Sequence, residues 1–218
     1  MKKSLLLAVS LLSLALPSPS RAADGPPNII YLISDDHAWT DYGFMGHPQI
    51  ETPNLDKLAA RSALFSRGYV PTALCRPALA TFANGLYAHQ HGVTGNDPSP
   101  LPEKPDGAGE AKAKGKGKGK GKAQPESPEY AALREKLIAK MDVQPTIMDL
   151  LGEKGYVSHQ SGKWWEGTTA RGGFTEGMTR GFPNPGGRHG DEGLKIGREG
   201  MDPVFDFIDR SVAAEKPF

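Results

Sequence analysis

The chain has 218 residues, of which 38% are hydrophobic and 23% are charged, and its formal net charge is +1. This composition is typical of one soluble globular domain, and the even charge balance gives no general argument for binding nucleic acid or a membrane surface. After the N-terminal segment, no stretch is apolar and long enough to span a bilayer.

The N-terminus has the pattern of a secretory signal peptide. Lys2 and Lys3 precede an apolar run from Leu5 to Leu16, and small residues lead to Ala22. The apolar run is too short for a spanning helix. We therefore predict that residues 1–22 are a signal peptide and that the mature protein is periplasmic or secreted.

A short apolar run, Asn28 to Ser34, predicts a buried central strand that ends at Asp35 and Asp36. Open α/β sheets place their ligands at the carboxyl ends of strands. Two adjacent carboxylates there favour a hard divalent cation such as Ca²⁺ or Mg²⁺. A solvated turn that caps a helix is the alternative that these residues leave open.

The next segments predict a strand–helix–strand unit. Thr52 and Pro53 are typical of a helix start, and Leu55 to Ser62 has an apolar stripe at helical spacing. Leu64 to Val70 then predicts a second strand. This order indicates an α/β fold with a central, mostly parallel sheet sandwiched between helices.

Cys75 is the only cysteine in the chain, so an internal disulfide is excluded. Pro77 and Gly85 bracket an apolar run and predict a helix that begins near Cys75. A thiol at a helix N-terminus lies where an anion is stabilised, which favours reactivity. A buried thiol that acts as a small hydrophobe is the alternative.

His89 and His91 would share a face of an extended segment, as in a metal or proton-transfer pair, whereas structural hydrogen bonding is the commoner role. Residues 98–128 predict a disordered insertion, because lysine alternates with glycine or alanine from Lys112 to Lys122 between flanks that are rich in proline and glutamate. That insertion is either a solubilising loop or a polycation that docks a sulfated polysaccharide or another polyanion. Helices are predicted over residues 129–142 and 203–214.

Residues 155–167 read GYVSHQSGKWWEG and place Lys163 just after a predicted strand at Tyr156 to Gln160. A lysine at that position can bind an oxyanion, although most lysines are only solvated charges. Trp164 and Trp165 predict an apolar wall, and Trp165 is a candidate for stacking on a sugar ring.

Two motifs of this chain resemble the signatures of the type I sulfatases, in the alkaline phosphatase-like superfamily. Cys75-Arg76-Pro77-Ala78-Leu79, followed by Asn84-Gly85, resembles C-x-P-S-R followed by T-G, and residues 155–164 resemble G-Y-x-S-x-x-x-G-K-W-H up to its tryptophan. The chain departs from the family pattern at Ala78, at Leu79 in place of arginine, and at Trp165 in place of histidine. Arg76 is close by, but from a helix start it is expected to point elsewhere.

The resemblance implies a catalytic Cys75 that a maturase oxidises to formylglycine, and a Ca²⁺ (or Mg²⁺) ion whose ligands include Asp35, Asp36 and the residue at position 75. It also implies that Lys163 is catalytic and binds the sulfate of a sulfated small molecule or carbohydrate. In such enzymes one hydroxyl of the hydrated formylglycine attacks the sulfur of the ester, and the aldehyde re-forms as sulfate leaves.

These expectations describe an arylsulfatase-like sulfuric ester hydrolase in which residues 26–218 form the N-terminal part of the catalytic domain. Two alternatives stay open: a phosphodiester or phosphonate ester hydrolase of the same superfamily, and an inactive, truncated sulfatase-like protein. Leu79 and Trp165 favour the latter.

Overall fold

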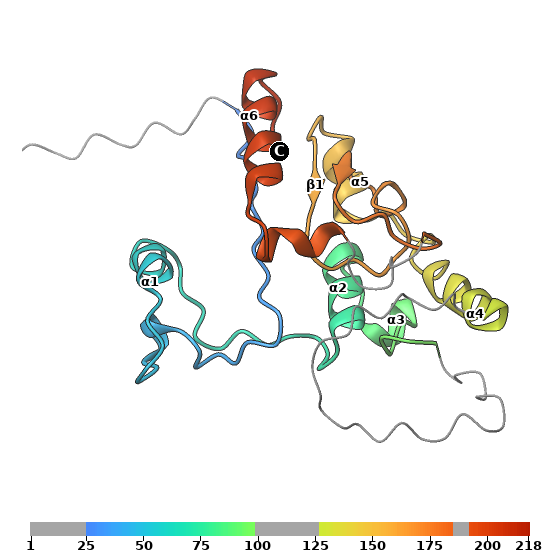
Figure 1. The fold of residues 1–218 in the computed structure, drawn as a ribbon, viewed down its shortest axis with the longest axis horizontal. Helices are drawn as coiled ribbons and strands as arrows, with labels where there is room; N and C mark the ends of the chain where they lie inside the picture. Colours follow the sequence, from blue (N-terminus) through green and yellow to red (C-terminus); the bar gives the residue numbers. More distant parts are fainter. Residues whose placement is uncertain (1–24, 99–126, 185–191) are drawn as a thin grey trace, which may run out of the picture.

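The computed structural model describes residues 25–98, 127–184 and 192–218. The predicted signal peptide and nearly all of the predicted lysine–glycine insertion lie outside these described residues. The helices are α1 (Pro53–Ala59), α2 (Cys75–Asn84), α3 (Ala88–His91), α4 (Pro128–Ile138), α5 (Ile147–Gly152) and α6 (Asp202–Ala213) (Figure 1). The 3₁₀ helices are η1 (Gly43–Met45), η2 (Ala170–Gly172) and η3 (Glu192–Gly197), and the strands are β1 (His159–Gln160) and β2 (Glu176–Gly177).

Strands β1 and β2 form a two-stranded parallel sheet in which His159 lies opposite Glu176. The C-terminal residues lie beside this sheet, because the Val157 amide donates to the Pro217 carbonyl at 2.9 Å. On their other side, the Ile29 amide donates to the Phe218 carbonyl at 2.6 Å. The arrangement is α/β with parallel pairing, as predicted, but its sheet is much smaller than the predicted central sheet.

The two strands predicted before Cys75 are wrong. Asn28 to Ser34 is extended but forms no strand, and its apolar side chains are exposed, from 47% for Ile29 to 72% for Leu32. Leu64 to Val70 is a loop in which Tyr69 is 88% exposed. A strand needs a ladder of partners on a neighbouring segment, and β propensity alone cannot supply one.

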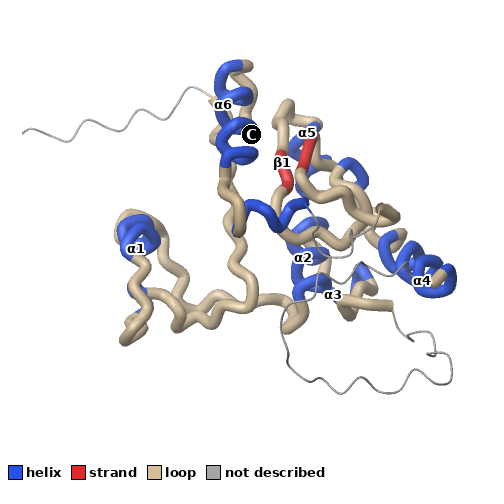
Figure 2. The backbone as a smooth tube through the Cα atoms, viewed as in Figure 1, coloured by secondary structure: helices blue, strands red, loops and turns tan. Residues whose placement is uncertain are grey.

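Helix α1 begins at Pro53 as predicted, but its apolar stripe does not face a core. Leu55 and Leu58 are 39% and 45% exposed, and no residue of α1 is buried. The Thr52 hydroxyl donates to Asp56 at 2.7 Å instead of capping the helix backbone. Figure 1 shows α1 set apart from helices α2 to α5, and Figure 2 shows that its flanking segments are mostly loop.

The core lies around α2. Its small residues Ala80 and Ala83 are fully buried and belong to one cluster with Val93, Met141, Met148 and Trp164. The helix ends at Gly85, whose φ of 71° is left-handed and therefore suits glycine. The predicted helix that begins near Cys75 and ends near Gly85 is confirmed.

The two later helices are confirmed with adjusted faces and ends. Helix α4 ends at Ile138, a few residues before the predicted end at Asp142. In α6, Phe207 is buried as predicted, but Val212 is 59% exposed because Ser211 is the residue that faces inward there. Among the described residues, no helix combines the length and the apolar character needed to cross a bilayer.

Candidate active site

The thiol of Cys75 faces the two aspartates that were predicted to lie near it. Cys75 is the first residue of α2, and its Sγ lies 3.7 Å from the Asp35 Oδ1 atom. One ligand atom each from Asp35, Asp36 and Cys75 lie within 4.8 Å of one another. The thiol is half-buried and the aspartates are exposed, so this group is open to solvent and to a ligand.

A turn at Asp36 brings both carboxylates to the same side. In an extended segment, neighbouring side chains point to opposite faces, which would separate the two acids. Asp36 instead has a φ of 54°, in the left-handed region that aspartate tolerates better than most residues. This conformation interrupts the alternation of side chains, so both carboxylates can lie on the same side of the chain.

Lys163 completes the group from a third part of the chain. It lies three residues after β1, and its Nζ donates to the Asp35 Oδ2 atom at 2.6 Å. This hydrogen bond is the main reason that the pKa of Lys163 lies above its ordinary value; partial burial acts against it, and the negative charges of Asp35 and Asp36 add to it. The lysine is therefore a firmly protonated cation beside the thiol and the acids.

The donor set fits a hard divalent cation. Two oxygen ligands of one Ca²⁺ ion lie no more than about 5.2 Å apart, and the three ligand atoms all lie within 4.8 Å of one another, so they are close enough to share one ion. Carboxylates are preferred ligands of Ca²⁺ and Mg²⁺, whereas sulfur is not. The Sγ atom marks the place that an oxygen of a formylglycine would take, and with that oxygen the set would consist entirely of hard ligands.

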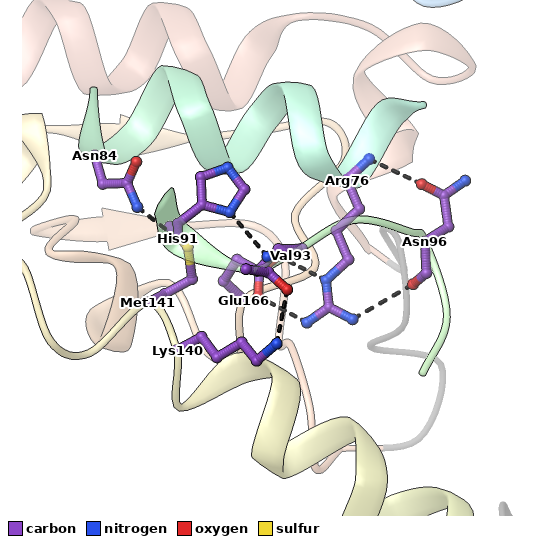
Figure 3. A network of polar contacts seen from close by, with 9 residues as sticks. Arg76, Asn84, His91, Val93, Asn96, Lys140, Met141 and Glu166 are labelled. Carbon is purple, nitrogen blue, oxygen red and sulfur yellow. Dashed lines mark hydrogen bonds and ion pairs between the residues drawn. The ribbon is translucent and has the colours of Figure 1, made fainter. Parts of the chain in front are cut away.

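Arg76 points away from this group, as the sequence indicated. Its side chain is fully buried and forms two hydrogen bonds to Glu166, both 2.7 Å long, which Figure 3 shows from close by. Arg76 therefore does not take over the role of the family arginine that Leu79 replaces. Leu79 is one helical turn after Cys75, on the same side of α2, and is half-buried.

His91 has the structural role that was the alternative to a metal or proton-transfer pair. The two histidines lie in the short helix α3 and not on an extended segment. His91 is 4% exposed, accepts from the Val93 amide at its Nδ1 and lies 3.2 Å from the Thr81 hydroxyl at its Nε2. Burial is the main reason that the pKa of His91 lies below its ordinary value.

The two tryptophans form the predicted apolar wall inside the protein. Trp164 belongs to the core cluster, and Trp165 is only 5% exposed. The prediction that Trp165 stacks on a sugar ring is therefore wrong for this structure. The Trp165 ring lies 5.7 Å from the Lys163 Nζ atom and so forms part of the surroundings of that lysine.

Sequence reasoning missed Glu166 and Asn96. Glu166 is 3% exposed beside Arg76, and the Asn96 side chain accepts from the Arg76 amide at 2.9 Å. A glutamate directly after two tryptophans was the one local signal, since a charge in an apolar run needs a partner.

Comparison with known proteins shows the family to which the sequence is similar. The sulfatase family profile matches residues 27–194. The chain is 28% identical to dog N-acetylgalactosamine-6-sulfatase over 90% of its own length and 38% of that protein's length. It is 30% identical to human arylsulfatase A, covering 68% of this chain and 23% of that protein.

A bacterial relative is also similar. The N-acetylglucosamine-6-O-sulfatase of Bacteroides thetaiotaomicron is 35% identical over 43% of this chain and 17% of that protein. The chain thus spans less than two fifths of the length of these three relatives. Because the profile covers most of its residues, the chain belongs to the sulfatase family.

Proposed function

We propose that this chain carries the nucleophile and part of the cation site of an arylsulfatase-like hydrolase that cleaves sulfate monoesters. The observation that carries the proposal is the convergence of Cys75, Asp35, Asp36 and Lys163 from three separate segments. Cys75 and Lys163 lie in the two motifs that resemble the signatures of the family, and Asp35 and Asp36 are the aspartates for which the resemblance implies a cation.

Each residue has a distinct role in this proposal. A formylglycine derived from Cys75 would supply the attacking hydroxyl, and a bound Ca²⁺ or Mg²⁺ ion would supply a Lewis acid. Asp35 and Asp36 would hold the cation. The N-terminus of α2 favours negative charge beside residue 75.

Lys163 would neutralise the sulfate. Its ammonium is charged at neutral pH, as is usual for lysine, and the raised pKa favours the charged form further. The side chain is 25% exposed and so within reach of a ligand. A fixed cation that faces a sulfate oxygen stabilises the charge that develops as the ester bond breaks.

The proposals for the substrate class, the partner and the compartment are based on the relatives of the chain and on its N-terminal sequence. We propose a sulfated small molecule or carbohydrate as the substrate, because similar sulfatases carry the names of sulfated amino sugars. A maturase would have to convert Cys75, and the predicted signal peptide would deliver the protein to the periplasm or the outside of the cell.

Hydrolysis assays test the proposal. The full chain, co-expressed with a formylglycine-generating maturase, is assayed on a panel of aryl sulfates, aryl phosphates and phosphonate esters with Ca²⁺ present. We expect turnover of aryl sulfates that Cys75→Ala and a chelator each abolish. Faster turnover of phosphorus esters would assign the chain to the other branch of the superfamily, and no turnover of any ester would indicate an inactive protein.

A further inference from the structure

We infer that the buried ion pair between Arg76 and Glu166 is a positioning device that holds Cys75 and Lys163 on the same carboxylate of Asp35. Its consequence for catalysis rests on the proposed function, but the placement itself can be tested without any activity. The pair joins residues 90 positions apart in the sequence, and each partner is a near neighbour of a candidate catalytic residue.

The geometry of the pair fixes both partners. The Arg76 Nε and Nη2 atoms each donate to one oxygen of Glu166 at 2.7 Å, and the two side chains are 0% and 3% exposed. A bidentate contact between a planar guanidinium and a planar carboxylate fixes the orientation of the two groups as well as the distance between them. A buried charge without a partner is costly, so the two residues have no favourable alternative to each other.

On one side, the pair orients the start of α2. Successive side chains of a helix are about 100° apart, so a guanidinium held in the interior turns the preceding Cys75 side chain outward. Asn96 strengthens this anchor, because its side chain accepts from the Arg76 amide at 2.9 Å and its carbonyl lies 3.4 Å from Nη1 (Figure 3).

On the other side, the pair anchors the segment that presents Lys163. Trp164, Trp165 and Glu166 are all buried, at 4%, 5% and 3% exposure, whereas Lys163 directly before them is 25% exposed. The segment is therefore fixed from inside, and the lysine emerges from its fixed end. Both ends of the device meet at Asp35, whose two oxygens contact the thiol and the ammonium.

A cross-link between Cys75 and Lys163 measures this placement directly. The full chain is produced in a host without a maturase, so that Cys75 keeps its thiol, and is treated with a short thiol–amine reagent. Mass spectrometry then quantifies the peptide pair that joins the two residues. We expect the wild-type chain to give this cross-link; its absence would overturn the inference.

Three variants separate positioning from stability. Glu166→Gln leaves the charge of Arg76 without a counter-charge, and Glu166→Asp keeps the charge but retracts the carboxylate by one methylene. Arg76→Met with Glu166→Met replaces the pair by apolar side chains of similar length. Asp142→Asn is the matched control, because Asp142 also accepts two hydrogen bonds from one arginine, Arg171, at a different place in the protein. Urea unfolding shows which variants are folded.

We expect the folded variants of the pair to give about tenfold less cross-linked peptide than the wild-type chain, because the loss of a supporting contact commonly changes the properties of a site by about 10- to 100-fold. The control should give the wild-type amount. Wild-type cross-linking in the double methionine variant, or in Glu166→Asp if that double variant does not fold, would show that the pair only stabilises the protein and would overturn the inference.

The formylglycine form adds a kinetic readout. Variants of the pair should lower kcat by about 10- to 100-fold and leave KM nearly unchanged, since the parts that hold a site act on its geometry in the reaction. A wild-type chain that hydrolyses no sulfate ester would refute the proposed function, while the cross-linking result would still decide the role of the pair.

Discussion

Replacing Lys163 by methionine removes the ammonium that contacts Asp35 and keeps most of the apolar side chain. The ion pair is partly open to water, with Lys163 25% and Asp35 52% exposed, and such pairs contribute less than about 1 kcal/mol to folding. In contrast, the loss of one preorganised charge-stabilising donor in an active site lowers kcat by about 10² to 10³. The variant should therefore be nearly as stable as the wild-type chain and almost inactive.

The assay compares kcat and KM on an aryl sulfate with the free energy of unfolding in urea. Lys195→Met is the matched control, because Lys195 also contacts a carboxylate, that of Glu192, but only within its own 3₁₀ helix. Lys163→Arg keeps the charge and should retain part of the activity. A Lys163→Met protein that is folded and hydrolyses sulfate esters at the wild-type rate would refute the role given to this lysine.

Three further predictions concern stability. Because the pKa of His91 is lowered, the unfolded chain takes up a proton more readily than the folded chain, and the free energy of unfolding should fall as the pH drops below about 6.5. Urea titrations of the wild-type chain and His91→Gln at pH 7.5 and pH 5 measure this difference. Ile138 is fully buried, and Ile138→Ala should lower the free energy of unfolding in urea by about 2 to 5 kcal/mol. A loss no larger than that of Val143→Ala, at a site that is 71% exposed, would contradict this. Gly181→Ala should lower the melting temperature, because its φ is +70° and a Cβ atom would overlap a backbone carbonyl, whereas Gly152→Ala, at a helix end with open space, should not.

The positions of the candidate site residues could be predicted from the sequence because each is tied to a local pattern. Cys75 lies at a helix start marked by Pro77, and Lys163 follows a strand and a glycine. The aspartates follow an apolar run that leads the chain toward the same place. Such signals depend on a few neighbouring residues, so they persist whether or not a large sheet forms.

Features that depend on distant partners could not be predicted in this way. Asn28 to Ser34 has the composition of a buried strand, but its burial depends on which segments pair with it, and the sequence of the run does not state that. Likewise, nothing near Arg76 reveals that its partner is Glu166, 90 residues later.

The mass of the tryptic peptide that contains residue 75 tests the central claim most directly. This peptide runs from Gly68 to Lys112, because proline follows both Arg76 and Lys104 and blocks cleavage there. After co-expression with a maturase, we predict a peptide in which the sulfur has been lost and an aldehyde oxygen gained. A peptide that keeps the full thiol mass under those conditions would contradict the account of Cys75 as the precursor of the nucleophile.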